Sequence, residues 1–349
     1  MSKSRDSIED LRTIDADLAA KLPLAGGTLT GDLNVPSVTA SGIVSDAGGN
    51  VRAGRKNLIL NGGFDVWQRG TSFTTNGYTA DRWELGLSGA TSTVTQQAFT
   101  LGQTEVPDNP TYYLKVDTTT ADNNCGLYYR VEDVRNGAGQ NVTLSFWAKG
   151  TNPAGDVFDL VSSQRFGTGG SGNVETITPL TFTSSWVKYT HTFSLASIAG
   201  KTVGAGNNLT LSIRQDGDDT STTAWNLNIA NVQLEVGSVA TDFEHRSYGE
   251  ELALCQRYYY KTAAIKYFNL GRFNVNTGNG LAWWVHPTTM RTTPSMSSNG
   301  TWNSDNGYSG DLGYNSINAS GCTVYSTVDI TSNQIVYAHG ASIVADAEL

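Results

Sequence analysis

The sequence predicts a mainly β protein with a short N-terminal helix, a glycine-rich stalk, a central β-sandwich or jelly roll and a β-rich C-terminal domain. Apolar and polar residues alternate in short runs between turn residues, as in half-buried strands. The chain holds 38 glycines, whereas average composition would give about 24. Charged residues make up only 16% of the 349 residues. The expected boundaries are 1–25 for the helical segment, 26–56 for the stalk, 57–246 for the sandwich and 247–349 for the C-terminal domain.

Charge and cysteine content exclude several classes of protein. Lys and Arg number 23 and Asp and Glu number 32, which gives a net charge of −9. Nucleic acids and anionic membranes attract clustered cations, so neither is an expected partner. Three cysteines without CxxC spacing predict neither a disulfide framework nor a zinc site. The N-terminus has charges where a signal peptide is apolar, and no apolar run reaches ~18 residues. We therefore expect cytoplasmic synthesis without a signal peptide, and no membrane insertion.

Residues 6–22 carry the only sustained helical periodicity in the chain. Apolar side chains fall at a and d positions of a heptad, and Asp15 occupies the intervening a position. The expected oligomerisation residues are Ile8, Leu11, Leu18 and Leu22. This pattern predicts a short helix that joins identical copies and ends at Pro23. A solvated helix that frays remains the alternative, because the segment is short.

Residues 24–51 alternate short β-branched pairs with glycine. Strands this short cannot bury a core within one chain. The segment is therefore either a flexible linker or a stalk in which several chains wrap together, and we favour the stalk.

Short β runs recur between turns from residue 57 to 246 and predict the sandwich. In 142–148 the residues Val142, Leu144, Phe146 and Ala148 share one face, so Trp147 points away from the core. In 186–193 the expected inward residues are Val187, Tyr189, His191 and Phe193. The expected strands are 57–60, 91–101, 111–116, 126–131, 142–148, 157–162, 186–193, 209–213 and 227–234.

The C-terminal domain is expected to begin with a helix over 249–261. Its clearest strands are 281–285, 322–330 and 334–338. The long Gly, Ser and Asn run over 295–321 would be hard for one chain to hold rigid. We therefore expect these strands to be stabilised by contact with a partner chain.

Catalytic patterns are weak. The four histidines lie outside any nucleophile motif, so no catalytic triad is expected. Asp65, Asp81 and Glu84 could supply the two carboxylates of a glycosidase, but any chain with 32 acidic residues offers such pairs. Residues 167–172 match G-x-G-x-x-G, yet a β-branched run ending in Pro179 follows, so the glycines are expected in a loop. We predict a non-enzymatic protein that requires no cofactor.

Two features allow for metal or sugar binding. Residues 216–219 place several carboxylates in one turn, but they lack the order of an EF-hand and are interpreted as a hairpin tip. Aromatic rings beside Asn, Asp and Gln can stack on sugars while the polar groups bind hydroxyls. The candidate glycan-binding residues are Trp302, Tyr308, Tyr314, Trp67, Trp83 and Trp147. A wider set includes Tyr112, Tyr113, Trp283 and Trp284, as well as Tyr128 and Tyr129, which as neighbours would place one ring on each face of a strand.

Most single rings belong to a core, so each candidate has a structural alternative. Trp302, Tyr308 and Tyr314 lie among Gly and Asn, and for these three we expect exposure.

Several segments resemble phage tail-fibre proteins. LPLAGGTLTGDL at 22–33 is similar to a short repeat of tail fibres, and 45–72 looks like the junction that leads into fibre heads. GEELALCQRYYYK at 249–261 and MRTTPSMS at 290–297 are similar to segments near the C-termini of such proteins. The resemblance implies a homotrimeric tail fibre or receptor-binding protein of a tailed phage, with a trimeric C-terminal tip.

The central part resembles jelly-roll carbohydrate-binding modules. The residues that carry this likeness are NLILNGGFDVW, LSFWAKG, SSWVKYTHTFSL and NIANVQLEVG. In that family loops near the first and last strands often hold a structural calcium, and the loosely corresponding positions are Asn61, Asp65 and Glu235. The resemblance implies a possible structural calcium and a sugar cleft lined by aromatic rings.

Together these features predict a virion tail subunit that adsorbs to a bacterial surface glycan or outer-membrane protein. Its expected partners are copies of itself and other phage tail or baseplate proteins. Two alternatives stay open at this point. One is a depolymerase that cleaves surface polysaccharide, and the other is a purely structural connector or decoration protein of the virion.

Overall fold

A computed structural model of the chain describes residues 45–46, 49–50, 55–120, 125–153, 157–215, 223–273, 278–305, 312–328 and 334–349. The chain divides into a unit of residues 1–44 and a unit of residues 45–349. The expected N-terminal helix, with Ile8, Leu11, Leu18 and Leu22, lies outside the described residues, as does most of the stalk. Within the stalk, β1 (Ser45–Asp46) pairs with β2 (Gly49–Asn50).

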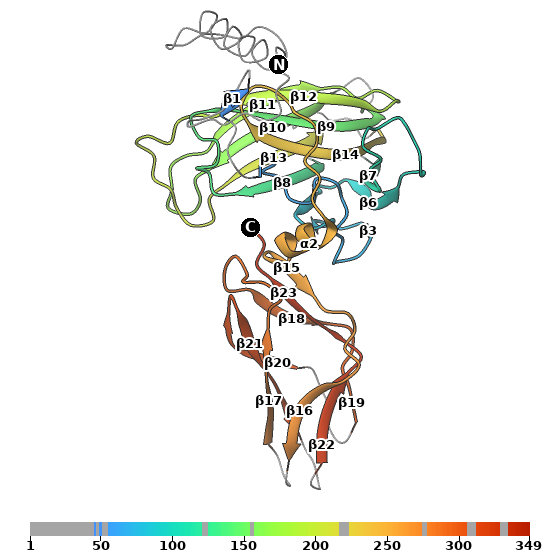
Figure 1. Ribbon diagram of the computed structural model, residues 1–349, viewed down its shortest axis with the longest axis vertical. Helices are drawn as coiled ribbons and strands as arrows, with labels where there is room; N and C mark the ends of the chain where they lie inside the picture. The colour runs from blue at the N-terminus through green and yellow to red at the C-terminus, as the bar shows by residue number, and fades with distance from the viewer. Residues whose placement is uncertain are drawn as a thin grey trace, which may run out of the picture. The chain divides into compact units, whose positions relative to one another are not determined.

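Two six-stranded antiparallel sheets form the sandwich (Figure 1). The first sheet has the order β11-β10-β13-β8-β5-β4 and is called the β8 sheet below. Its strands are β4 (Gly77–Tyr78), β5 (Trp83–Gly86), β8 (Gly126–Glu132), β10 (Phe158–Arg165), β11 (Val174–Leu180) and β13 (Asn208–Gln215).

The second sheet has the order β12-β9-β14-β7-β6-β3 and is called the β9 sheet. Its strands are β3 (Ser72–Phe73), β6 (Thr91–Ala98), β7 (Tyr112–Thr120), β9 (Asn141–Thr151), β12 (Val187–Ser194) and β14 (Trp225–Val236). Most of the predicted strands therefore exist, and the predicted mainly β sandwich is confirmed.

The core lies between the inner faces of the two sheets. In β9, Val142, Leu144, Phe146 and Ala148 are at most 3% exposed, so the alternation read from the sequence is confirmed. The β8 sheet supplies Leu85, Leu127, Leu160, Leu209 and Leu211, among others. Burying one such side chain stabilises the fold by about 1.5–3 kcal/mol.

The strands differ from the sequence prediction in three details. Residues 57–60 form no strand, because the Asn57 side-chain oxygen accepts hydrogen bonds from the backbone N–H groups of Ile59 and Leu234. Val187 lies opposite the inward residue Ala148, as expected, but it is 40% exposed because β12 is an edge strand. Strand β11 was not predicted, because it is an edge strand that tolerates Pro179 and has no buried face to produce a clear alternation.

The C-terminal region contains three three-stranded sheets around a small core. Their orders are β15-β23-β18, β16-β22-β19 and β17-β21-β20. The strands are β15 (Tyr259–Lys261), β16 (Phe268–Phe273), β17 (Gly278–Val285), β18 (Ser295–Asn299), β19 (Asn303–Asp305), β20 (Gly313–Asn318), β21 (Gly321–Val328), β22 (Gln334–His339) and β23 (Ser342–Asp346). Parts of the run 295–321 are thus held by pairing within the chain.

The helix α2 (Tyr248–Gln256) is shorter than the expected 249–261. Ser247 caps its N-terminus by accepting a hydrogen bond from the backbone N–H of Glu250. Residues 259–261 form β15 instead of a last helical turn, because Tyr259 pairs with Asp346 of β23 and aromatic residues favour strands. This helix is too short and too polar to cross a membrane, and it is the one α-helix among the described residues.

Buried polar side chains tie the start of the sandwich to the segment around α2. Arg246 donates hydrogen bonds to the carbonyls of Asn57 and Ile59 at 2.6 and 3.1 Å, and it pairs with Glu251 at 3.3 Å. Glu251 also accepts a hydrogen bond from the backbone N–H of Asn61 at 2.7 Å. The sandwich and α2 are therefore joined through hydrogen bonds as well as chain connectivity.

Asp81 is a second buried polar group near this junction. Its side chain is fully buried and accepts hydrogen bonds from the backbone N–H of Gln68, at 2.9 Å, and from the Gln68 side-chain amide. Burial raises the pKa of Asp81 to about 6, because the bonds from Gln68 offset only part of the cost of burying a charge.

This shift predicts a pH-dependent stability. The folded carboxyl, with a pKa of about 6, holds its proton more tightly than the ordinary carboxyl with pKa 3.8. Its contribution is thus complete below about pH 4 and is lost as the pH rises through 6. The unfolding free energy of the wild type, relative to Asp81→Asn, should fall by roughly 2 kcal/mol between pH 4 and pH 7. Urea denaturation of both proteins across this range measures the difference, and a pH-independent difference would contradict the assignment.

Candidate functional site

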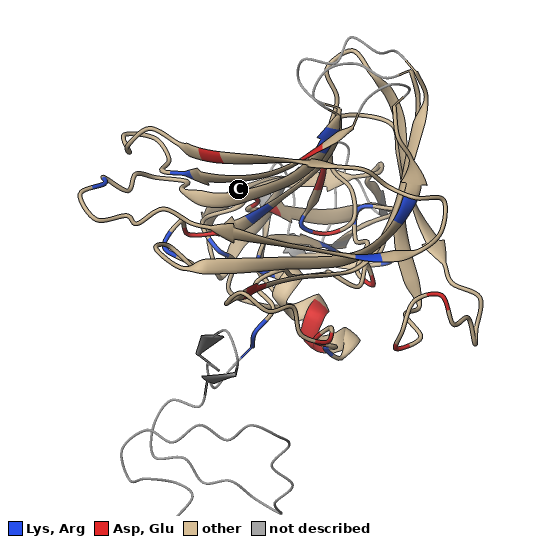
Figure 2. Ribbon diagram, turned by 90° about the horizontal axis from the view of Figure 1, so that it is seen from above, with Lys and Arg blue, Asp and Glu red and all other residues tan. Residues whose placement is uncertain are grey.

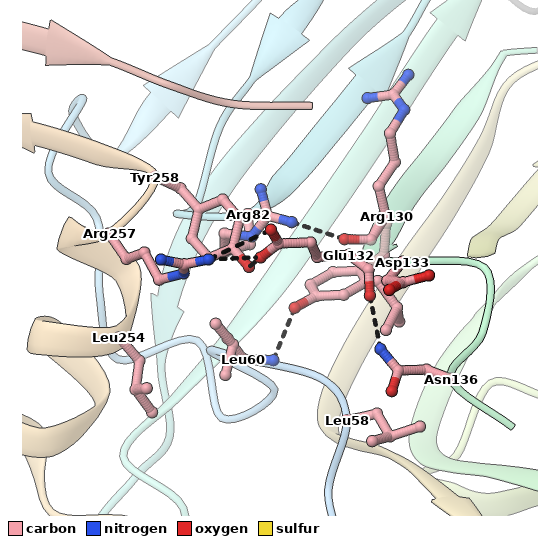
Figure 3. Close-up of a pocket in the computed structure, with 12 residues that line it drawn as sticks. Leu58, Leu60, Arg82, Arg130, Glu132, Asp133, Asn136, Leu254, Arg257 and Tyr258 are labelled. Carbon is pink, nitrogen blue, oxygen red and sulfur yellow. Dashed lines mark hydrogen bonds and ion pairs between the residues drawn. The ribbon is translucent and has the colours of Figure 1, made fainter. Parts of the chain in front are cut away.

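A pocket of about 400 Å³ lies at the end of β8, beside α2 (Figure 3). Strand β5 begins at Trp83, which pairs with Tyr129, so from Arg130 onward β8 has a hydrogen-bonded strand on one side only. Leu58 and Leu60 line the pocket on one side. The pocket therefore forms because β5 is shorter than β8.

Arg82 lies directly before β5 and fills part of this gap. Its guanidinium is fully buried, and Nη2 donates a 2.6 Å hydrogen bond to the carbonyl of Arg130. Nη1 forms an ion pair with Glu348, and the guanidinium stacks 3.6 Å from the centre of the Tyr258 ring. Arg82 has a φ of 73°, a left-handed conformation that is uncommon outside glycine. The Arg82 side chain thus contacts β8, Glu348 after β23 and Tyr258 after α2.

The polar groups at the rim of the pocket are paired with one another. Glu132 accepts hydrogen bonds from the Tyr258 hydroxyl at 2.7 Å and from Arg257 at 3.2 Å. The Asn136 amide donates to the Glu132 carbonyl at 2.6 Å. Burial raises the pKa of Tyr258 to about 12, with the bond to Glu132 adding to the effect and Arg82 opposing it. These contacts stabilise the junction and leave few free groups for a ligand.

The outer face of the β8 sheet carries a different arrangement, centred on Tyr128. Tyr129 points into the core, so its neighbour Tyr128 points outward and is half-buried. The Tyr128 ring leans across β5 over Gly86, where an added Cβ would lie 2.5 Å from the ring. Glycine at this position lets the ring lie close to the sheet. We call this outward surface around Tyr128 the Tyr128 face.

An arginine and two acids lie on one side of the Tyr128 ring. Arg214 hydrogen bonds with Tyr128. Its Nη2 lies 3.7 Å from a carboxylate oxygen of Asp159 and 3.7 Å from one of Glu175. Burial raises the pKa of Tyr128, and Arg214 opposes that rise. The Arg214 Nε is buried and has no hydrogen-bond partner in the described part of the chain. Because this nitrogen is shielded from solvent, it is not a contact point for a ligand.

A second ion pair lies on the other side of Tyr128. Arg130 pairs with Glu84, which is directly opposite Tyr128 on β5. Arg130 also donates a 3.2 Å hydrogen bond to the hydroxyl of Tyr78. The half-buried ring is thus flanked by fixed guanidinium and carboxylate groups.

Small polar side chains lie near the ring and are covered by neighbouring groups. Ser163, Thr210 and Ser212 point away from the core, yet they are at most 5% exposed, because other groups rise around them. Thr210 lies opposite Arg130, and Ser212 lies opposite Tyr128. The Tyr128 face therefore combines an aromatic ring with guanidinium donors and carboxylate acceptors.

Two predicted glycan-binding rings are in fact core residues. Trp83 is 4% exposed and packs between Phe64 and Tyr129 at centroid distances of 5.1 and 4.9 Å. Trp302 is 5% exposed, and its indole N–H donates to the Ser298 hydroxyl at 2.8 Å. The expectation of exposure for Trp302 is wrong, because the surrounding Gly and Asn residues fold around a small core of their own.

The other candidate rings are half-buried or not described. Trp67 packs on the sandwich core and donates to the Phe64 carbonyl at 2.7 Å. Tyr314 packs on the C-terminal core, so its expected exposure is only partial. Trp147 points away from the core as predicted and joins an aromatic cluster on the outer face of the β9 sheet. Tyr308 lies outside the described residues, as do residues 216–219.

The possible calcium positions are occupied by local hydrogen bonds. The Asn61 side chain donates to the carbonyls of Val66 and Asp81 and accepts from the Val66 N–H. Glu235 accepts hydrogen bonds from Thr241 at 2.7 and 2.8 Å. Burial raises the pKa of Asp65. In the described ranges no three His, Cys, Asp or Glu residues are grouped to hold a metal ion. Structural calcium at these positions stays a prediction.

No protein-family model matches the chain, and a search of curated proteins finds no match. Among solved structures, the chain is similar to the xylan-binding CBM22-2 domain of Paenibacillus barcinonensis Xyn10C, with TM-score 0.30 and 13% identity over 47% of this chain and 98% of that one. It is also similar to the cellulose-binding domain of Cellulomonas fimi β-1,4-glucanase C, with TM-score 0.30 and 20% identity over 51% and 95%. A tailspike domain of bacteriophage CBA120 matches with TM-score 0.30 and 13% identity over 52% of this chain and 21% of that one.

Because the Arg82–Glu348 ion pair is buried, we expect the unfolding free energy to depend strongly on both residues. Glu348→Met leaves the Arg82 guanidinium buried without its counter-charge, which should cost about 3–5 kcal/mol of unfolding free energy. Arg82→Met combined with Glu348→Met should recover most of that loss, because the buried guanidinium of Arg82 is removed and Arg69, the other partner of Glu348, keeps its ion pair with Asp346. Guanidinium chloride denaturation measures both variants.

Arg135→Met supplies the matched control, since Arg135 forms an exposed pair with Asp133 and should cost less than about 1 kcal/mol. Equal losses for Glu348→Met and Arg135→Met would contradict the role given to the buried pair.

Proposed function

We propose that this chain binds glycans through the Tyr128 face and serves as a tail-fibre or tail-tip subunit that adsorbs a tailed phage to a bacterial surface. The observation that carries the proposal is the half-buried Tyr128 ring with Arg214 on one side and the Arg130–Glu84 ion pair on the other. A sugar has an apolar face that stacks on a ring and hydroxyls that both donate and accept hydrogen bonds. Guanidinium and carboxylate groups on both sides of one ring match that chemistry.

The proposed activity is binding without catalysis. Asp159 and Glu175 lie near Arg214, and Glu84 is paired with Arg130, so each acid on the face has an arginine as its neighbour. Asp81 has the raised pKa of a catalytic acid, but it is fully buried and cannot meet a substrate. No cofactor is part of the proposal.

Self-association would supply the strength that single sugar contacts lack. In the proposal, residues 1–56 join three copies and attach them to other tail or baseplate proteins of the virion. Three linked faces bound to one surface can exceed the affinity of one face by ~10²-fold. The partner on the bacterium is a surface glycan, or an outer-membrane protein that carries one.

A glycan array with the purified full-length chain tests the binding site. Tyr128→Ala removes the ring and should weaken binding about tenfold or more, the equivalent of roughly 1.4 kcal/mol. Gly86→Ala should weaken binding as well, because the new Cβ displaces the ring. Tyr248→Ala is the matched control, since Tyr248 is 60% exposed and lies outside the Tyr128 face.

Thermal unfolding of each variant separates lost binding from lost fold. A repeat of the array with a calcium chelator tests the calcium prediction independently. Unchanged glycan binding by folded Tyr128→Ala would refute the proposed site, and no binding to any glycan or to bacterial cells would refute the proposed function.

A further inference from the structure

Strand β17 exposes a row of large apolar side chains. Leu281, Trp283 and Val285 are 60%, 54% and 62% exposed, while Trp284 between them packs on the C-terminal core. Side chains of β17 therefore alternate between the core and the outer surface, and the outward ones are apolar. Contiguous apolar surface of this kind usually marks an interaction site.

The neighbouring strands extend this row into a flat surface. On β21, Tyr325 lies opposite Leu281 and Gly321 lies opposite Val285. A Cβ at Gly321 would lie 3.2 Å from the Trp283 ring, and a Cβ at Gly313 of β20 would overlap the Tyr325 ring. The Trp283 and Tyr325 rings therefore pack directly against glycine backbone. We call this outward surface of the β17-β21-β20 sheet the β17 face.

The three strands of this sheet contain no Lys, Arg, Asp or Glu. The whole chain carries a net charge of −9, and its charged residues are scattered along the ribbon (Figure 2). Because the chain is acidic overall, contact between two copies through charged surfaces would bring like charges together and cause repulsion. Contact through the uncharged strands of the β17 face avoids this repulsion. An anionic membrane would require basic residues that these strands lack.

Strand β17 has a hydrogen-bonded neighbour on one side only, since its sheet has the order β17-β21-β20, although β16 also lies close to it. An apolar edge strand favours pairing with another chain. The heptad pattern over residues 6–22 independently predicts that copies are joined at their N-termini, which raises the local concentration of the C-terminal regions. The absence of charge, the position of β17 in its sheet and the N-terminal heptad pattern therefore all favour a second copy of the chain as the partner of the β17 face.

We propose that copies of this chain contact one another through the β17 face. The inference rests on the self-association in the proposed function, and it specifies where the C-terminal regions touch.

Cross-linking of the full-length chain tests this contact. The three native cysteines are buried, so Leu281→Cys introduces the reactive thiol. A short bismaleimide should link copies of Leu281→Cys at least ~10-fold more than copies of Leu101→Cys, because effective concentration is high only at the contact. Leu101 is a matched control, being 98% exposed on the sandwich. Sedimentation equilibrium gives the oligomeric mass of both proteins.

A charge variant tests the same contact. Trp283→Glu added to Leu281→Cys should lower cross-linking about tenfold, since it buries an unpaired charge at the contact. Val239→Glu is its control, because Val239 is also exposed, at 45%.

The possible outcomes are distinct. If the protein is oligomeric but positions 281 and 101 cross-link equally, the β17 contact is refuted and self-association is not. If the protein is monomeric, the β17 contact and the proposed self-association are both refuted. A monomer that loses attachment to bacterial cells on Trp283→Glu would instead assign the face to the receptor.

Discussion

A fully buried guanidinium, that of Arg82, constrains much of the structure around it. Burying this charge requires a counter-charge and hydrogen-bond acceptors, which Glu348 and the carbonyl of Arg130 supply. Because Glu348 follows β23, the constraint fixes the segment after β23 against the sandwich. It also stabilises β8 beside the first residue of β5.

The geometry of the Tyr128 face follows from the same strand. Residues 128, 130 and 132 of β8 alternate onto the outer surface, so the ring, one ion pair and the rim of the pocket share one row. Arg82 holds the backbone of Arg130, while the Arg130 side chain pairs with Glu84 beside the ring. The buried pair keeps β8 in place, and in the proposed function it would support the binding face without contacting the sugar itself.

The sequence predicted the sandwich well because period-2 alternation reports which face of a strand is buried, as for Val142 to Ala148. It also indicated that Tyr128 and Tyr129 lie on opposite faces. It did not single out Tyr128, since Arg214, Gly86 and Glu84 reach the ring only through strand pairing between distant segments. The prediction for Trp302 failed because turn-rich composition does not reveal a small local core. Trp283 belonged to the wider set of rings, but its exposure depends on which strand lies at the edge.

The central claim is that the Tyr128 face contacts the glycan. The most direct measurement is a crystal structure of the chain with an oligosaccharide selected from the array. The account predicts a sugar ring stacked on Tyr128, with a sugar hydroxyl hydrogen-bonded to a guanidinium or carboxylate group beside the ring. A sugar bound on the outer face of the β9 sheet near Trp147, with the Tyr128 face empty, would contradict it.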